Sequence, residues 1–113
     1  MTGEPRRHVL VVCSRNLRRS LTAEQLLRRS PLCVARSVGT ASSARVQVRE
    51  ADIEWADVVY AMEQSHIDQL RKRFRAALAG CDVVCLDVPD DFEYMDADLV
   101  EMLAIALREY LPS

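Results

Sequence analysis

The chain has 113 residues, half of them apolar and 28% charged, with 15 Lys and Arg against 17 Asp and Glu for a formal net charge of -2. This composition excludes a disordered, collagen-like or low-complexity chain and predicts one soluble globular domain over residues 1–113. The near-neutral balance argues against a dedicated nucleic-acid binder, and two histidines are too few for a Cys/His zinc pattern. We therefore expect no nucleic-acid partner and no metal.

The cysteines and the apolar runs indicate the compartment. Four cysteines lie in or beside apolar runs, rather than at the regular spacings of a small secreted scaffold: Cys13, Cys33, Cys81 and Cys85. They are typical of reduced intracellular thiols. Residues 1–8 are polar and no stretch approaches 18 apolar residues, so we expect neither a signal peptide nor a membrane span. The prediction is a cytoplasmic protein without a membrane partner.

The first half of the chain alternates strand, helix and strand. Residues 8–13 form a short, β-branched, nearly continuous apolar run, which is typical of a strand buried on both faces of a parallel sheet. A polar loop follows, and apolar residues recur at helical spacing from Ser20 to Arg29. A second strand is predicted over 33–38, followed by a loop of small polar residues over 39–43.

The second half continues the same rhythm. A short helix over 49–54 precedes a strand over 56–61, and a longer helix over 62–79 ends at Gly80. A fourth strand over 82–88, a polar and aromatic loop over 89–96 and a final helix over 99–110 complete the chain. Alternating strands and helices predict an α/β fold with a parallel sheet covered on both faces. Ligands bind at the carboxyl ends of such strands, which points to the loops over 13–19 and 89–96.

The loop after the first strand carries the pattern C-x5-R-S, from Cys13 through Arg19 to Ser20. Five intervening residues can curl so that backbone N–H groups converge beside the start of the next helix, which forms an anion site. The same field favours the thiolate of Cys13, and a thiolate beneath a bound phosphate is a nucleophile aimed at phosphorus. Arg19 can offer a planar fork to two phosphate oxygens, and Ser20 can donate to the thiolate.

Arginine is concentrated in this loop. Fourteen of the 15 basic residues are Arg, and Arg15, Arg18 and Arg19 lie within five positions. A cation at a helix start is unfavourable unless an anion is present, which again indicates an anion site. We assign Arg19 to the chemistry and place Arg15 and Arg18 at the rim, where they would attract acidic or multiply phosphorylated substrates.

The motif V-L-V-V-C-x-x-N-x-x-R-S-x-x-A-E over 9–24 resembles the opening of the low molecular weight protein tyrosine phosphatases. S-V-G-T over 37–40 and A-D-V-V-Y-A-M-E over 56–63 are similar to further motifs of that family, and P-D-D-F-E-Y-M-D over 89–96 looks most like a short bacterial branch. The resemblance implies a three-layer sandwich with a four-stranded parallel sheet of order 2-1-3-4.

The same resemblance implies a metal-free and cofactor-free phosphatase that forms a cysteinyl-phosphate. Its partners would be a phosphorylated protein or a small aryl phosphate, with inorganic phosphate as product and inhibitor. The loop residues expected to bind phosphate, beside Cys13 and Arg19, are Ser14, Arg15, Asn16, Leu17, Arg18 and Ser20. The chain departs from the family at Arg15, which replaces a glycine, and at Arg18, which replaces a second cysteine.

An aryl leaving group needs a proton, and a positioned Asp is the usual donor beside a cysteine nucleophile. The resemblance puts Asp90 in that register, with Asp91 as the next candidate. Phe92 and Tyr94 fall near the family's aromatic pair, which flanks the substrate ring, although packing on the sheet edge explains Tyr94 equally well. Asp96 and Asp98 are better explained as caps of the last helix.

Two other functions fit parts of this sequence. Arsenate reduction occurs on the same fold with an extra cysteine pair, for which Cys81 and Cys85 are the candidates. The second alternative is a non-catalytic phosphate or phosphopeptide binding module, which would follow if the Asp loop were misplaced.

Overall fold

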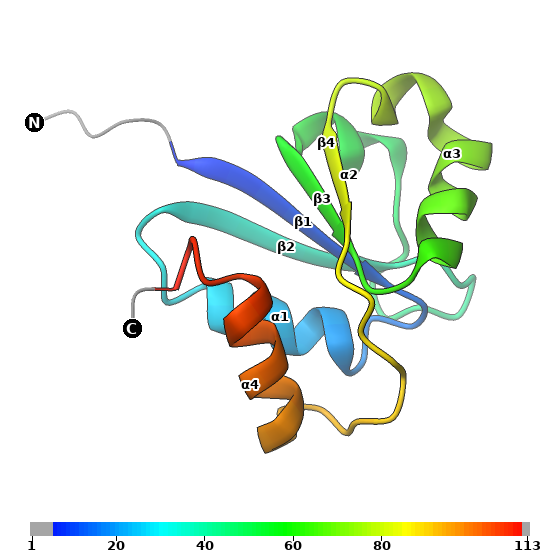
Figure 1. Ribbon diagram of the computed structural model, residues 1–113. Coiled ribbons are helices and arrows are strands. Elements are labelled where there is room, and N and C mark those ends of the chain that lie inside the picture. Colours follow the sequence, from blue (N-terminus) through cyan, green and yellow to red (C-terminus); the bar gives the residue numbers. More distant parts are fainter. Residues whose placement is uncertain (1–5, 112–113) are drawn as a thin grey trace, which may run out of the picture.

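The computed structural model describes residues 6–111, so most of the polar N-terminal stretch lies outside the described residues. Strands and helices alternate along the chain (Figure 1). They are β1 (Arg7–Cys13), α1 (Arg19–Leu27), β2 (Cys33–Gly39), α2 (Glu50–Trp55), β3 (Val58–Ala61), α3 (Gln64–Leu78), β4 (Asp82–Cys85) and α4 (Ala97–Ala106).

The four strands form one parallel sheet in the order β2-β1-β3-β4, which confirms the expected topology. Cys13 at the end of β1 is in register with Gly39 at the end of β2. Ala61 at the end of β3 is in register with Val12 on one side and Cys85 on the other. The carboxyl ends of all four strands therefore meet at one edge of the sheet.

Alternating side chains of β1 supply two apolar cores, one on each face of the sheet. Val9 and Val11 pack in the core that includes residues of α1 and α4, whereas Leu10 and Val12 pack in the core that includes residues of α2 and α3. This alternation follows from the two-residue period of a strand. The result is the expected three-layer sandwich.

The last strand and the last helix are shorter than the sequence predicts. β4 ends at Cys85 because β3, its partner, ends at Ala61, and the chain then turns through Asp87, whose φ is 57°. α4 ends at Ala106, after which Leu107 and Tyr110 are buried against the core beneath it. The apolar periodicity continues past Ala106 because these side chains still face the core, although the backbone is no longer helical.

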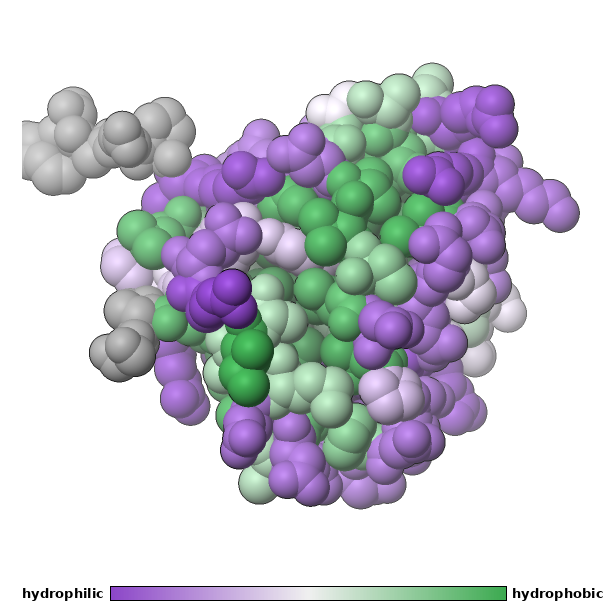
Figure 2. Space-filling view, in the orientation of Figure 1, coloured by the Kyte–Doolittle hydropathy of each residue, from purple (hydrophilic) through white to green (hydrophobic). Residues whose placement is uncertain are grey.

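Apolar side chains gather on the face of the molecule that carries β4 and α4 (Figure 2). Val84 is in register with Tyr60 on this face, yet it is exposed, because α4 packs against α1 rather than over the edge strand. Met102 and Ile105 of α4 are exposed as well. Hydrophilic side chains border the apolar region in this view.

Candidate active site

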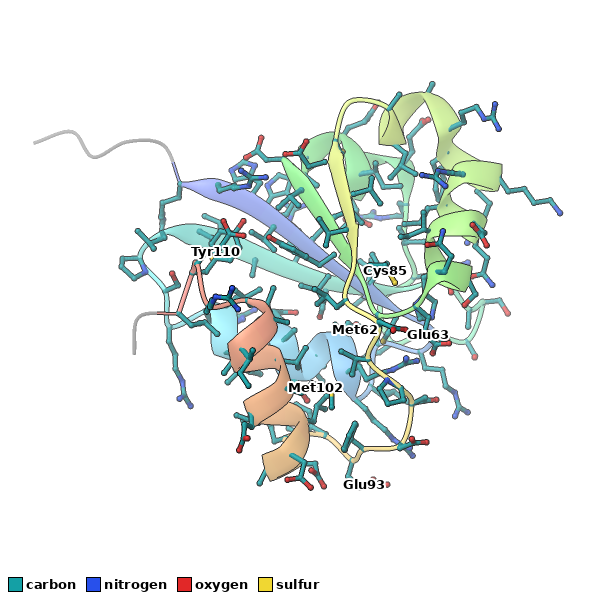
Figure 3. The ribbon with its side chains drawn as sticks, in the orientation of Figure 1. Met62, Glu63, Cys85, Glu93, Met102 and Tyr110 are labelled. Carbon is teal, nitrogen blue, oxygen red and sulfur yellow. The ribbon has the colours of Figure 1, made fainter. Side chains whose placement is uncertain are left out.

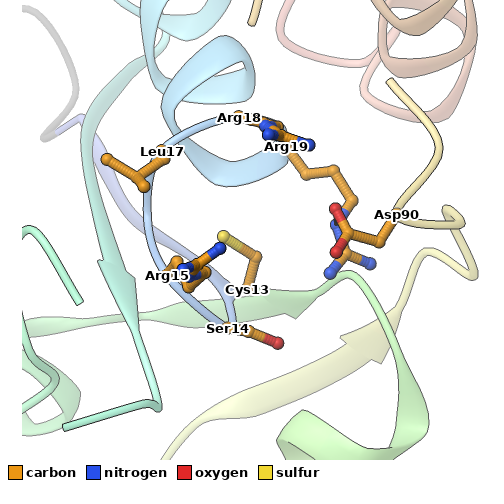
Figure 4. Close-up of a pocket in the computed structure, with 7 residues that line it drawn as sticks. All are labelled: Cys13, Ser14, Arg15, Leu17, Arg18, Arg19 and Asp90. Carbon is orange, nitrogen blue, oxygen red and sulfur yellow. Dashed lines mark ion pairs between the residues drawn. The ribbon is translucent and has the colours of Figure 1, made fainter. Parts of the chain in front are cut away.

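The loop between β1 and α1 (residues 13–20, hereafter the β1–α1 loop) surrounds a small pocket at the carboxyl edge of the sheet (Figure 4). Six of its residues and one residue of the β4–α4 connection line this pocket: Cys13, Ser14, Arg15, Leu17, Arg18, Arg19 and Asp90. Cys13 ends a central strand whose four preceding side chains, those of residues 9–12, are fully buried. The base of the pocket is thus attached to the most enclosed strand of the sheet.

Two donors converge on the Cys13 sulfur. The backbone N–H of Asn16 donates to Sγ over 3.2 Å, and Ser20 Oγ lies 2.9 Å from Sγ. Asn16 Nδ2 donates to Ser20 Oγ over 2.8 Å, so the single hydroxyl proton of Ser20 has two acceptors, the sulfur at 2.9 Å and the Val38 carbonyl at 3.4 Å. Both Asn16 and Ser20 are fully buried. Two polar partners therefore contact the sulfur inside the protein, and a sulfur anion could accept from both.

The β1–α1 loop is supported from behind by the segment that follows β2. The carbonyl groups of Ser14 and Arg15 accept hydrogen bonds from the backbone N–H groups of Ala41 and Arg45, each over 2.9 Å. In a trans peptide the carbonyl and the following N–H point in opposite directions, so the N–H groups after these carbonyls turn toward the pocket. The bond from the Asn16 N–H to Cys13 Sγ has this direction.

Arg19 is 2% exposed, and its guanidinium lies beside the carboxyl of Asp90 (Figure 4). Its Nη1 donates to Glu63 Oε2 over 2.5 Å and to the Val88 carbonyl over 2.8 Å. Its Nε lies 3.6 Å from Asp90 Oδ1. Because Nη1 is occupied, the fork formed by Nε and Nη2 is the part of the guanidinium that remains for an anion in the pocket.

Glu63 and His66 belong to the site, although the sequence pattern did not select them. Glu63 follows β3 at the edge of the sheet where the strands end (Figure 3), and His66 is in the first turn of α3. His66 Nδ1 accepts from the Glu63 backbone N–H over 3.1 Å, so the ring proton is on Nε2, which donates to Ser14 Oγ over 2.9 Å. These two side chains connect Arg19 and Ser14 to one helix start.

Both side chains have shifted pKa values. The hydrogen bond from Arg19 holds the pKa of Glu63 below its usual range, and the positive charge of Arg19 acts in the same direction. Burial lowers the pKa of His66, and the nearby charge of Arg19 lowers it further. At neutral pH Glu63 is therefore anionic and His66 neutral, as the hydrogen bonds require.

The connection from β4 to α4 brings Asp90 to the pocket, but not the other residues of this connection that the sequence predicts for the site. Asp91, Phe92 and Tyr94 are absent from the pocket lining; Phe92 packs against the core on the α1 side, and Tyr94 is 46% exposed. Asp96 accepts hydrogen bonds from the N–H groups of Asp98 and Leu99, so it is the cap of α4, as the sequence predicts. Asp98 lies in the first turn of that helix.

The rim of the pocket is basic and partly apolar. Arg15 and Arg18 are exposed, and Arg18 lies 3.8 Å from Glu93, which is on the outer bend of the connecting loop (Figure 3). Leu17 is 46% exposed although it lines the pocket. The rim thus offers two cations and one apolar side chain to whatever is attached to a bound anion.

Cys81, which precedes β4, and Cys85, which ends it, do not line this pocket. Cys81 donates to the carbonyls of Ile53 and Ala56 at the opposite edge of the sheet, and Cys85 is separated from β1 by β3. All four cysteines are free thiols. Among the described residues, no three His, Cys, Asp or Glu side chains gather as a metal-binding group.

A comparison with family models and with curated protein sequences finds no match. Solved structures do match. The arginine phosphatase YwlE from Geobacillus stearothermophilus is 22% identical, with 91% of this chain and 92% of that chain covered at a TM-score of 0.72. The tyrosine phosphatase Wzb from Escherichia coli K30, in complex with phosphate, is 20% identical over 91% and 94% of the two chains at 0.76. Wzb of Vibrio vulnificus, in complex with benzylphosphonate, is 19% identical over 94% and 97% at 0.76.

The fold is that of the low molecular weight protein tyrosine phosphatases. The resemblance noted in the sequence is confirmed at the level of the fold, with the same strand order. Within residues 6–111, no helix has the length and apolar character needed to cross a membrane.

The β1–α1 loop accommodates Arg15, which stands where the low molecular weight phosphatase pattern has a glycine. Among the described non-glycine residues, a positive φ occurs at Asn16 (59°), Asp87 (57°) and Met95 (60°), but not at Arg15. Asparagine tolerates the left-handed conformation because its short polar side chain bonds locally, as it does here to Ser20. A glycine is therefore not required at position 15.

Proposed function

We propose that the protein is a phosphomonoesterase that hydrolyses phosphotyrosine in proteins, or small aryl phosphates, through a cysteinyl-phosphate intermediate. One observation carries this proposal: the Cys13 sulfur, with its two donors, shares a pocket with the fork of Arg19 and the carboxyl of Asp90. The phosphatase fold of the solved neighbours supports it. The four free thiols agree with the proposed cytoplasmic location.

In the first step the thiolate of Cys13 attacks phosphorus and the bond from phosphorus to the bridging oxygen breaks. Asp90 enters this step as the carboxylic acid and passes its proton to the bridging oxygen, so the phenol leaves uncharged. The Nε and Nη2 groups of Arg19, with the loop N–H groups, bind the other phosphate oxygens and stabilise the charge that develops. A phosphate in the pocket also competes with Asp90 for Arg19, which frees the carboxyl to approach the leaving group.

In the second step water attacks the phosphorus of the cysteinyl-phosphate. The bond from sulfur to phosphorus breaks, the Asp90 carboxylate takes a proton from the water, and the thiolate is restored with inorganic phosphate as the product. Hydrogen bonds from Asn16 and Ser20 stabilise the sulfur as a leaving group. Since the product occupies the same donors as the substrate, inorganic phosphate should inhibit competitively.

The rim supports an aromatic substrate. Leu17 presents an apolar side chain beside the pocket, where the ring of a phosphotyrosine would pack. Phosphoarginine is the second candidate because one structural neighbour is an arginine phosphatase. A comparison of kcat/KM for a phosphotyrosine peptide and a phosphoarginine peptide of the same sequence separates the two, and we expect the phosphotyrosine peptide to be preferred.

Turnover of para-nitrophenyl phosphate tests the mechanism. Cys13→Ser should abolish turnover, and Asp90→Asn should slow it by about 10²- to 10⁴-fold, the usual contribution of a general acid. Asp91→Asn is the matched control and should retain near-normal activity. The opposite result for the two Asp variants would move the proton transfer to Asp91, and activity that survives alkylation of Cys13 would refute the proposal.

Two further measurements, phosphate binding and arsenite production, discriminate the two alternatives. A binding module would bind phosphate without turnover in the wild-type protein. An arsenate reductase would produce arsenite in the presence of thiols, and this activity would require Cys81 or Cys85. Because both cysteines lie away from Cys13, we expect no arsenite.

A further inference from the structure

A groove of about 490 Å³ runs along the outer edge of β2, between α1 and the start of α2. It is separate from the pocket of Cys13. Two side chains link the groove to the loop around Cys13. Arg45, which lines the groove, donates through its Nε to the Asn16 carbonyl over 3.2 Å, and Ser20 Oγ donates to the carbonyl of Val38, another lining residue, over 3.4 Å. The proposed phosphatase chemistry uses none of the other residues that line the groove.

The floor of the groove contains an unpaired strand edge. β2 is the outermost strand of the sheet on this side (Figure 1), and its residues alternate in the direction of their N–H and C=O groups. Thr40 donates to Cys13 of β1, whereas Gly39 donates outward to Val46 and accepts from Val48. By this alternation the N–H and C=O groups of Ala35 and Ser37 also point outward, into the groove.

The upper end of this edge already has a strand partner. Gln47 forms a parallel bridge with Gly39. The bridge consists of two hydrogen bonds, from the Gly39 N–H to the Val46 carbonyl and from the Val48 N–H to the Gly39 carbonyl. On the amino-terminal side of this bridge no described strand pairs with Ala35, which is half-buried, or with Ser37, which is 4% exposed. An extended segment placed there would continue the line of residues 46–48 along β2.

The walls of the groove are cationic at the surface. Four arginines line it, namely Arg28, Arg36, Arg45 and Arg49, in a chain whose net charge is -2. Its two carboxylates are buried beneath them. Glu24 is 6% exposed and bonds to Arg28 and Ser37, and Asp52 is 4% exposed, accepts from the Arg49 N–H and lies 3.7 Å from the Arg36 guanidinium and 3.8 Å from that of Arg49. Four arginines against two carboxylates still leave the groove with an excess of positive charge. An approaching chain therefore meets guanidinium N–H groups before it meets either carboxylate.

We propose that the groove binds an extended acidic peptide segment, which adds to the sheet as a strand beside β2. The outward-pointing N–H and C=O groups of Ala35 and Ser37 would bond to the peptide backbone, as in other cases of strand addition. The arginines would select acidic side chains by charge complementarity. Binding does not depend on the proposed phosphatase function, so either can fail without the other.

The probe is a fluorescein-labelled decapeptide of alternating Glu and Val, whose binding is followed by fluorescence anisotropy. Amide hydrogen exchange of the wild-type protein, followed by NMR, then locates the contact. We expect slower exchange of the Ala35 and Ser37 amides when the peptide is bound. The Val83 and Cys85 amides, which lie on the open edge of β4, are the internal control and should not change.

Charge is tested with a matched pair of double variants. Arg36→Gln/Arg49→Gln should weaken peptide binding about fivefold, the effect of two exposed charge contacts. Arg71→Gln/Arg75→Gln removes the same charge from α3 and should not weaken binding. Because the exchange experiment uses the wild-type protein, it remains informative if the groove variant does not fold.

Several results would overturn the proposal. They are no binding of the Glu-Val peptide, protection of Val83 and Cys85 instead of Ala35 and Ser37, or equal weakening by both double variants. Equal binding of a Lys-Val peptide would also overturn it. So would equal binding of a ten-residue oligo-dT or of a Glu-Val peptide with alternate N-methyl groups, because strand addition requires peptide N–H groups.

Discussion

Arg19 is a buried cation with one occupied side and one open side. Glu63 and the Val88 carbonyl hold Nη1, while Asp90 is the only charged group near Nε in the described part of the chain. A side chain with this many rotatable bonds loses substantial entropy on being fixed, and Glu63 and Val88 fix it before any substrate is present. Glu63 is therefore a positioning residue for the proposed reaction.

The Glu63→Gln variant tests this role. It keeps an acceptor oxygen but loses the charge, so we expect kcat/KM for para-nitrophenyl phosphate to fall about tenfold, as a charge-assisted bond weakens. The thermal stability should change little, because Glu63 is half-exposed. The matched control is Glu54→Gln on the exposed surface of α2. In an Arg19→Lys background Glu63→Gln should have little further effect; an undiminished loss there would contradict the positioning role.

His66 makes the stability of the protein depend on pH. Its pKa in the folded state lies below the ordinary value of 6.5, because burial and Arg19 disfavour its charged form. The unfolded state thus binds the proton more readily, and the stabilisation from neutral His66 is complete above about pH 6.5 and is lost as the pH falls toward the folded pKa. Urea unfolding of wild-type protein and His66→Gln should differ most at pH 7.5 and less at pH 5. A difference that grows at low pH would contradict this sign.

The sequence led to Cys13, Arg19 and Asp90 but not to Glu63 or His66. The first three belong to local patterns, a loop spacing and a family register. Glu63 and His66 act through contacts that span 44 and 52 residues, and such contacts depend on which strands are neighbours. A usable signal was present: Glu63 lies two residues after the predicted third strand, at the edge where the strand carrying Cys13 also ends.

At the scale of elements, the end of β2 determines how closely the β1–α1 loop can be supported. A Cβ atom at Gly39 would overlap the Ser14 carbonyl oxygen and lie 2.7 Å from the Ala44 side chain. Glycine is thus needed for close approach of two backbones rather than for an unusual φ, since no described glycine has a positive φ.

Gly39→Ala should displace the β1–α1 loop. We expect a loss of about 1–3 kcal/mol in the free energy of unfolding, as in other overpacked sites, together with a severe loss of turnover. Gly80→Ala is the matched control, because the nearest atom to its added Cβ is 3.6 Å away. Chemical denaturation and para-nitrophenyl phosphate assays of both variants check this. Equal behaviour of the two glycine variants would refute the steric argument.

The start of α4 depends on one side chain. Asp96 accepts from two N–H groups of the first turn, so Asp96→Ala should cost about 1 kcal/mol of stability. Asp98→Ala removes the same charge without removing the cap and should cost only a few tenths. Thermal unfolding of the two variants measures the difference. A larger loss in Asp98→Ala would show that charge, not capping, holds this helix start.

At the scale of the whole molecule, the fold was predictable because the residue pattern of each strand indicates which of its faces are buried. The β-branched runs of β1 and β3 read as strands covered on both faces, and alternation with helices fixes a parallel sheet. The predicted ends of β4 and α4 were wrong because apolar residues continue beyond the last residue of each element. Leu86 and Val88 still bond to β3 and its continuation, and Tyr110 still bonds to Tyr60.

Phosphate should stabilise the whole molecule through the pocket. A ligand at 100 times its dissociation constant adds about 2.7 kcal/mol, which for a domain of this size raises Tm on the order of 10 °C. We expect this rise in wild-type protein with inorganic phosphate and its loss in Arg19→Ala. Sodium chloride at matched ionic strength is the control. The same rise in Arg19→Ala would place the bound anion elsewhere.

The rim of the pocket is built differently from its base. Cys13, Asn16, Arg19 and Ser20 are buried among partners, whereas Arg15, Leu17 and Arg18 project into solvent. Substitutions at exposed positions usually change stability by less than about 0.5 kcal/mol. The rim can therefore be altered with little effect on folding. These three positions are the natural starting set for changing the substrate preference of the proposed enzyme while the buried residues at the bottom of the pocket are kept.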